Sequence, residues 1–157
     1  LTSLDNSLQV LLETRQREGG KLQTMLLDRC EAASQQVDQI REKLPEITQK
    51  IRERYNRKAK ELQVELDNER LEQEMLILTQ KMDVSEELDR LETHIEEVRR
   101  VLNETVPVGR RLDFLMQELN REANTLGSKA ASVDMSNVSV ELKVLIEQMR
   151  EQIQNIE

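Results

Sequence analysis

The run from Glu46 to Val106 contains neither glycine nor proline, the residues that most often interrupt regular secondary structure. Apolar residues recur through it at spacings of three and four, which indicates an amphipathic helix. One unbroken helix of this length would extend about 90 Å at about 1.5 Å per residue. The apolar stripe changes register near Asp67 and near Asp83, so we expect the helix to bend or break near one of these positions.

Large aromatic side chains are almost absent. The 157 residues include one Phe, one Tyr and no Trp, with only four Gly and two Pro. The core must therefore be a narrow seam of Leu, Ile, Val, Met and Ala, as in long helices and coiled coils. We predict an all-α fold without β-strands, a long antiparallel helical hairpin or coiled-coil-like bundle with shorter C-terminal helices.

The first part of the chain, residues 1–67, is predicted to be a long helical segment. Gly19-Gly20 lies inside its apolar pattern as either a joint or a tolerated weak spot, costing about 1 kcal/mol per glycine relative to alanine. Pro45 marks either a kink or the start of a new helix, because proline disfavours helical geometry at the preceding residue and suits a first turn.

The clearest turn in the chain is Pro107-Val108-Gly109. A helix is predicted to follow it and to end between Ser128 and Ala131. A linker at Ser132–Val138 would then lead into the last helix, with Ser136 as its N-cap. The expected apolar seam of that last helix consists of Val140, Val144, Leu145, Met149, Ile153 and Ile156.

The helix after this turn carries two rows of hydrogen-bonding side chains beside an apolar face. The apolar face consists of Leu112, Leu115, Leu119, Ala123 and Leu126. One polar row consists of Asp113, Gln117, Arg121, Asn124 and Ser128, and the other of Glu118, Glu122, Thr125 and Lys129. Carboxylates can supply oxygen ligands to Mg²⁺ or Mn²⁺, and arginine can hold phosphate through paired hydrogen bonds. The two rows together favour a site for an anionic ligand or a metal.

His94 is the only histidine, and it shares one helix face with Asp83, Glu87 and Arg90. A neutral imidazole beside carboxylates can ligate a divalent metal or act as a general base. The alternative is a boundary histidine that pairs with Glu87 or Glu97.

Two arginine pairs bracket the Pro107 turn. They are Arg99-Arg100 and Arg110-Arg111. Four arginines near one helical corner form either a phosphate-contacting patch or a solvated charged face.

The formal net charge of −8 argues against a protein that coats nucleic acid with a basic face. It does not exclude a nuclease, because catalytic metal sites are built from carboxylates. Cys30 is the only cysteine, so no intrachain disulfide forms. No run approaches the ~20 apolar residues that span a bilayer and no signal peptide is visible, so we expect a cytoplasmic protein without membrane association.

A long set of polar positions resembles the signature of the YicC-type proteins. The resemblance is densest in Gly109-Arg110-Arg111-Leu112-Asp113-Phe114, Gln117-Glu118, Asn120-Arg121-Glu122-Ala123-Asn124-Thr125 and Ser128-Lys129. It continues through Asn68–Glu74, Glu86–His94, Ser136-Asn137, Glu141–Lys143 and on to Ile156-Glu157. It covers the last part of the chain, residues 68–157, densely and residues 1–67 loosely.

The resemblance implies a bacterial endoribonuclease, of a group long described as stress-induced, in which residues 68–157 form the C-terminal helical domain. It further implies an N-terminal domain that this chain lacks and a ring-like homo-oligomer, a hexamer. It also places His94 within the family's motif, which favours a functional interpretation of that residue. We accordingly expect metal-dependent cleavage of RNA phosphodiester bonds, with Mn²⁺ or Mg²⁺ stabilising the developing charge.

Candidate site residues follow from the resemblance and the rows together. The catalytic candidates are His94, Glu87, Glu118 and Glu122. The RNA-binding candidates are Arg90, Arg110, Arg111, Gln117, Arg121, Asn124, Ser128 and Lys129. The metal-ligand candidates are Asp83, Glu87, His94, Asp113 and Glu118. The alternative function is a coiled-coil oligomerisation scaffold or RNA-binding adaptor without chemistry of its own, in which the polar rows make subunit contacts.

Overall fold

The computed structural model describes residues 2–61, 69, 72–74, 76–77, 83–104 and 108–155. These residues form helices α1 (Thr2–Glu61), α3 (Ser85–Leu102), α4 (Gly109–Ser128) and α5 (Val133–Gln154), with no strand among them. The all-α prediction is confirmed. α1 has 60 residues and the other three have 18 to 22, so a long first helix packs with three shorter ones. In the second arm of the predicted hairpin, the described residues are mainly those of α3.

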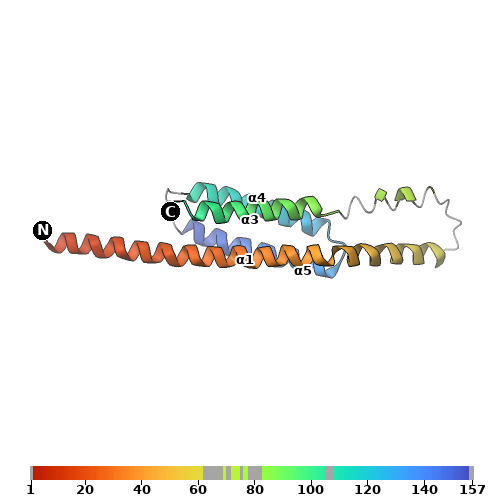
Figure 1. The fold of residues 1–157 in the computed structure, drawn as a ribbon, viewed down its shortest axis with the longest axis horizontal. Helices are drawn as coiled ribbons and strands as arrows, with labels where there is room; N and C mark the ends of the chain where they lie inside the picture. Colours follow the sequence, from red (N-terminus) through yellow and green to blue (C-terminus); the bar gives the residue numbers. More distant parts are fainter. Residues whose placement is uncertain are drawn as a thin grey trace.

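The four helices pack as a bundle in which each has two neighbours (Figure 1). α1 packs against α3 and α5, and α4 packs against the same two helices. α4 therefore lies across the bundle from α1. The face of α4 that is turned away from its two neighbours is exposed to solvent.

The core is the aliphatic seam expected from the composition. All five residues of the predicted apolar face of α4 are buried, together with Met116. α3 contributes a continuous stripe of buried residues: Leu88, Leu91, Ile95, Val98 and Val101, with Val84 just before it. From α1 the core takes Leu26, Cys30, Ala33, Val37, Ile40 and Ile47. Burial raises the pKa of the Cys30 thiol to about 11, so this thiol stays protonated.

α1 runs without interruption through Gly19-Gly20 and through Pro45. The prediction of a new helix at Pro45 is therefore wrong. Pro45 is exposed, so the carbonyl that loses its amide partner there can bond to water, while Leu44 and Ile47 on either side keep packing on the bundle. A continuous helix also fits the interpretation of Gly19-Gly20 as a tolerated weak spot.

The predicted break near Asp83 is confirmed. Asp83 and Val84 are not helical, α3 starts at Ser85, and Asp83 Oδ1 accepts a hydrogen bond of 3.0 Å from the Ser85 amide. This bond lowers the pKa of Asp83. The register change near Asp67 lies outside the described residues. The turn predicted at Pro107 lies largely outside the described residues; α4 begins at Gly109 and ends at Ser128, as expected.

The start of α5 and part of its buried face differ from the prediction. Ser132, not Ser136, is the N-cap: its backbone is extended and its Oγ accepts a hydrogen bond of 3.2 Å from the Met135 amide. The residues between Val133 and Val138 are accordingly helix and not linker. Val140 and Val144 are 59% and 44% exposed. The buried face is set by contact with both α1 and α4, and it consists of Met135, Val138, Ser139, Leu142, Leu145, Ile146, Met149 and Ile153.

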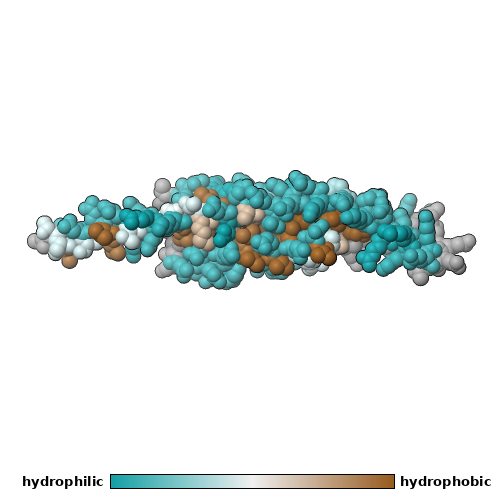
Figure 2. Space-filling view, turned by 90° about the horizontal axis from the view of Figure 1, so that it is seen from below, coloured by the Kyte–Doolittle hydropathy of each residue, from teal (hydrophilic) through white to brown (hydrophobic). Residues whose placement is uncertain are grey.

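The first part of α1 projects beyond the bundle (Figure 1). Residues 2–21 are all exposed, and Leu4, Leu8 and Leu11 are 68%, 53% and 56% exposed. The space-filling view shows hydrophobic groups on this projection within an otherwise hydrophilic surface (Figure 2). None of the described helices has an apolar stretch that would allow it to cross a membrane.

α4 and α5 approach most closely at Gly127. Ser139 Oγ donates a 2.9 Å hydrogen bond to the Ala123 carbonyl, and a Cβ at position 127 would lie 2.5 Å from that Oγ. We expect Gly127→Ala to lower the free energy of unfolding by about 1–3 kcal/mol, because the buried contact must separate. Denaturant unfolding followed by circular dichroism measures this effect.

Gly20→Ala is the matched control. A Cβ at Gly20 meets nothing within 4 Å, so the ordinary helix preference for alanine should stabilise the protein by up to about 1 kcal/mol. Adding Ser139→Ala to Gly127→Ala removes the clashing oxygen and should recover most of the loss. A Gly127→Ala variant as stable as the parent would contradict the close contact.

Candidate functional site

A ladder of charged side chains runs along the seam between α3 and α4. On α3, Glu87, Arg90, His94 and Glu97 follow each other at spacings of three and four, so they share one face. On α4 the facing residues are Lys129, Glu122, Glu118 and Arg111. The two helices are antiparallel here, because the order of the paired residues along α4 is the reverse of their order along α3.

The first rung joins Lys129 to Glu87. The Glu87 side chain is only 2% exposed, and its Oε1 lies 2.7 Å from Lys129 Nζ. Lys129 Nζ also lies 3.5 Å from the Asp83 carbonyl oxygen, and Arg90 lies 3.6 Å from Glu87 Oε1. Glu87 Oε2 is buried and has no hydrogen-bond partner among the described residues. A carboxylate held this way is costly to leave without its cation.

The second rung joins Arg90 to Glu122. Arg90 Nε lies 3.0 Å from Glu122 Oε1, and the Glu122 side chain is 9% exposed. The hydrogen bond that Arg90 donates to Glu122, together with the negative charge of Glu122, raises the pKa of Arg90. Two of the catalytic candidates, Glu87 and Glu122, lie in this part of the seam. Both therefore form ion pairs with cationic side chains of the same chain.

The far end of the ladder is a cluster around Glu97. Arg111 lies 2.6 Å from Glu97 Oε1, and Arg100 contacts both oxygens of the same carboxylate. The hydrogen bond from Arg100, helped by the charges of Arg100 and Arg111, lowers the pKa of Glu97 to about 2. Arg99 points to the other side, toward Glu31 on α1 at 3.0 Å. Three of the four corner arginines thus neutralise carboxylates, and the predicted four-arginine patch is reduced to Arg110.

His94 and Glu118 lie between the Arg90–Glu122 and Glu97–Arg111 rungs. Each is one helical turn from the Arg90–Glu122 pair, His94 along α3 and Glu118 along α4, so the register places them opposite each other. Both side chains are partly exposed. Neither makes a hydrogen bond or ion pair with any residue that the structure describes, so the alternative pairing of His94 with Glu87 or Glu97 is not observed. This is the one level of the ladder where an imidazole and a carboxylate remain available.

The candidate metal ligands are not gathered at one point. Among the described residues, no three His, Cys, Asp or Glu side chains lie close enough together to hold a metal ion. Asp83 caps α3, Glu87 is bonded to Lys129, and Asp113 lies beside Ile153 and Gln154 on the α5 side of α4. The described residues of a single chain therefore supply no cluster of three metal ligands.

The two polar rows of α4 have different surroundings. The row that contains Glu122 and Lys129 faces α3 and forms the ladder. In the other row, Gln117, Arg121, Asn124 and Ser128 are exposed, while Asp113 is partly exposed and accepts a 3.4 Å hydrogen bond from the Gln117 side-chain amide. Arg110 extends this line by two turns. Arg110 and Arg121 form no ion pair with any described residue. We call the exposed line Arg110, Phe114, Gln117, Arg121, Asn124 and Ser128 the outer row.

Phe114 is the member of the outer row that was not expected to be functional from the sequence. It is 57% exposed, although it is the only Phe of a chain that is short of aromatic side chains. Its spacing from Arg110 and Gln117, four and three residues, is the sequence signal that could have identified it.

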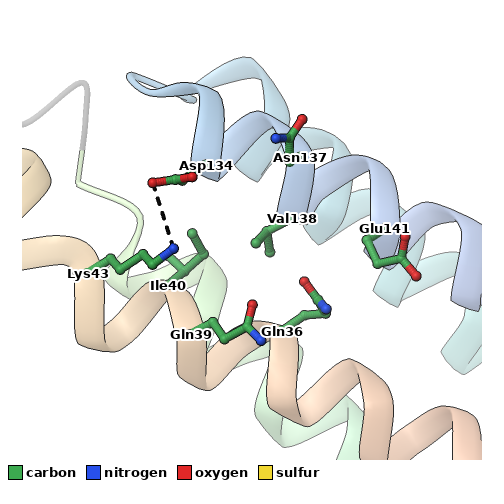
Figure 3. A pocket seen from close by; sticks show the side chains of 8 residues that line it. All are labelled: Gln36, Gln39, Ile40, Lys43, Asp134, Asn137, Val138 and Glu141. Atoms are coloured by element: carbon green, nitrogen blue, oxygen red, sulfur yellow. Dashed lines mark ion pairs between the residues drawn. The ribbon is translucent and has the colours of Figure 1, made fainter.

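A polar groove lies between α1 and α5, and none of its lining residues was named as a site candidate, although Asn137 and Glu141 belong to stretches that carry the family resemblance. Figure 3 shows its lining residues: Gln36, Gln39, Ile40, Lys43, Asp134, Asn137, Val138 and Glu141. Lys43 and Asp134 are 3.8 Å apart at one end, and amide groups from both helices line the rest. Its two carboxylates outnumber its one cation, so it is less suited to an anionic ligand than the outer row.

Fold and site together describe an all-α bundle with exposed arginine and amide side chains on one helix, and with His94 and Glu118 at one level of the neighbouring helix seam. Residues 40–157 match the family model described as "Endoribonuclease YicC-like, C-terminal". The chain belongs to this family.

Two relatives extend the match over almost the whole chain. A protein of Haemophilus influenzae named probable endoribonuclease YicC is 48% identical over 157 residues, which are 100% of this chain and 55% of that protein. A protein of Clostridioides difficile with the same name is 35% identical over 158 residues, covering 99% of this chain and 54% of that protein. The chain thus spans about half the length of these curated relatives.

Proposed function

We propose that this chain is the helical C-terminal part of a cytoplasmic endoribonuclease, and that it binds RNA along the outer row of α4. The observation that carries the proposal is the pairing pattern of the arginines. Among the arginines of α3 and α4, Arg90, Arg99, Arg100 and Arg111 are engaged by carboxylates, whereas Arg110 and Arg121 form no ion pair with any described residue. Asp113 lies beside this line and accepts a hydrogen bond from Gln117, so the line and its neighbouring carboxylate together carry two arginines against one carboxylate. Phosphate groups are the ligands that free arginines recognise best.

The family supports RNA as the ligand, since both relatives are named probable endoribonucleases. Amide side chains of Gln117 and Asn124 can hydrogen-bond base edges or ribose hydroxyls of RNA that lies between the two arginines. Gln117 and Glu118 are consecutive, so the outer row and the His94–Glu118 level are adjacent on the surface of α4.

We assign proton transfer to His94. A neutral imidazole without a competing partner can accept the proton of the hydroxyl group that attacks the phosphate. Glu118, opposite it on α4, can orient the imidazole and stabilise the imidazolium that forms. Glu87 and Glu122 act in this proposal as parts of the ladder that holds α3 and α4 in register.

A requirement for Mn²⁺ or Mg²⁺ remains a prediction. Because the described residues of one chain gather no three ligands, no step of the cleavage is routed through a metal here. A bound metal would supply charge stabilisation at the phosphate, with ligands that include groups beyond this set. RNA cleavage should be measured in the presence of a chelator and again after Mn²⁺ or Mg²⁺ is added back. Loss with the chelator and recovery with one metal would establish the requirement.

Self-association is part of the proposal and is supported by the projecting part of α1. Leu4, Leu8 and Leu11 recur at spacings of four and three and are all more than half exposed, so they form an apolar line that a second chain or a further domain can cover. Assembly into the expected hexamer would bring several outer rows together. The same line supports the alternative function, an oligomerisation scaffold without chemistry. If the protein sediments as a monomer at micromolar concentration, both the hexamer and the scaffold function are excluded.

The test of RNA binding is the affinity for a single-stranded oligoribonucleotide as a function of salt concentration. We expect Arg110→Gln and Arg121→Gln each to weaken binding and to make the salt slope shallower by about 0.7, the value for one phosphate contact on a single strand. Arg17→Gln, on the projecting part of α1, is the matched control and should leave both quantities unchanged. The variant that combines Arg110→Gln with Arg121→Gln should bind most weakly. If it binds as tightly as Arg17→Gln, the outer row is not the RNA site.

A further inference from the structure

Phe114 occupies an unusual position for the only phenylalanine in a chain with so little aromatic surface to bury. It is 57% exposed, whereas every residue of the neighbouring apolar face of α4 is buried. Sequence pattern and packing both keep it out of the core. The exposed ring contributes little to the core, so it is available to a ligand, and its neighbours decide whether it serves one.

The neighbours of Phe114 indicate the chemistry of that ligand. Arg110 lies one turn before it and Gln117 one turn after it, and Arg121 follows two turns after it. Along the helix axis the two arginines are separated by about 16 Å, with the ring between them. All other members of the outer row are polar, so the exposed ring is a single apolar group within a line of cations and amides. Protein interfaces are usually built on a larger apolar patch.

We propose that Phe114 stacks on an unpaired base of single-stranded RNA, with Arg110 and Arg121 holding phosphates on either side of that nucleotide. This inference rests on the proposed function and adds the form of RNA that is recognised. An aromatic ring between cationic groups is the arrangement by which proteins bind single strands, since every base has a face that can stack. Bases in a duplex are already stacked on each other and cannot offer that face. The outer row is therefore selective for single-stranded over double-stranded RNA.

The chain contains no Trp, so Phe114→Trp introduces the only tryptophan, which can be excited selectively over Tyr55. We expect a single-stranded oligouridylate to quench its fluorescence. An RNA duplex, or the same strand with abasic nucleotides, should leave it nearly unchanged. Val140→Trp is the matched control, because Val140 is 59% exposed and lies on α5 and not on the helix that carries the outer row. It should show no quenching with any of the three probes.

Phe114→Leu tests the contribution to affinity. Leucine keeps an apolar side chain at an exposed position, so unfolding should be unchanged, while the affinity for the single strand should fall roughly 5- to 150-fold, the range for loss of one base–aromatic stack. Affinity for the abasic strand should not change.

Three results would overturn the stacking proposal. Binding of the single strand by Phe114→Leu as tightly as by the parent would remove it and leave RNA binding by the outer row intact. Fluorescence of Phe114→Trp that depends on protein concentration without RNA would assign the ring to a contact between copies. Failure of the parent protein to bind the single strand would remove the proposed function, and the stacking with it.

Discussion

His94→Ala is expected to reduce the rate of RNA cleavage by about 10²- to 10⁴-fold, the usual contribution of a general acid or base. The affinity for RNA should remain within a factor of about two, because His94 lies in the α3–α4 seam and not in the outer row. The reason for the large effect is that no other imidazole exists in the chain. Single-turnover cleavage, with binding measured separately, distinguishes the two quantities.

Thr93→Ala provides the control for His94→Ala. Thr93 is exposed on α3, and its Oγ1 donates a hydrogen bond to the Asp89 carbonyl within the same helix. It should cleave like the parent. Unchanged cleavage by His94→Ala would show that the proton transfer belongs to another group, and Glu118 would then be the next candidate to replace.

Lys129→Met is expected to lower the free energy of unfolding by about 2–3 kcal/mol. Removal of one partner from a buried ion pair typically costs about 3–5 kcal/mol, and the value is smaller here because Lys129 is one-third exposed and Arg90 lies 3.6 Å from the same carboxylate oxygen. Denaturant unfolding at neutral pH measures the loss.

The double variant Glu87→Met with Lys129→Met decides whether the loss comes from an uncompensated charge. Two apolar side chains of similar size can replace a buried ion pair with little change in stability, so the double variant should be close to the parent. A double variant as unstable as Lys129→Met would contradict this account of the seam. If the double variant is stable but does not cleave RNA, while Lys129→Met does cleave it, Glu87 acts in catalysis, as the sequence pattern allowed.

The spacing of apolar residues was sufficient to predict the fold class and the buried faces of α3 and α4. Each of these helices has one apolar stripe, and burial follows the stripe. α5 was predicted less well because it packs against two helices at once, so Leu142 and Ile146 became buried and Val140 stayed exposed. Ser132 and Ser136 are equally good caps by residue type. The choice between them depends on the extended backbone of Ser132, which the sequence does not specify.

The two polar rows of α4 could be predicted from the sequence, but which of them is buried against α3 and which is exposed could not. Spacing places Arg121 and Glu122 on neighbouring rows of one helix, and only the position of α3 decides that Glu122 is buried against Arg90 while Arg121 remains free. Asp113 and Glu87 were grouped as metal ligands by residue type. Asp113 lies on the side of α4 that faces α5, whereas Glu87 belongs to α3, which packs on another side of α4. Residue type identified the chemistry, and helix packing determined which groups can perform it.

The unequal lengths of the helices have a consequence for how α1 opens. α1 extends about 90 Å and its partners only about 27–33 Å at about 1.5 Å per residue, so residues Leu22 to Ile51 pack on the bundle while residues 2–21 are exposed to solvent. Backbone amides of residues 2–21 can exchange with solvent by fraying, whereas those near Cys30 and Val37 exchange only when the bundle separates. One continuous helix thus has at least two segments that differ in their local opening.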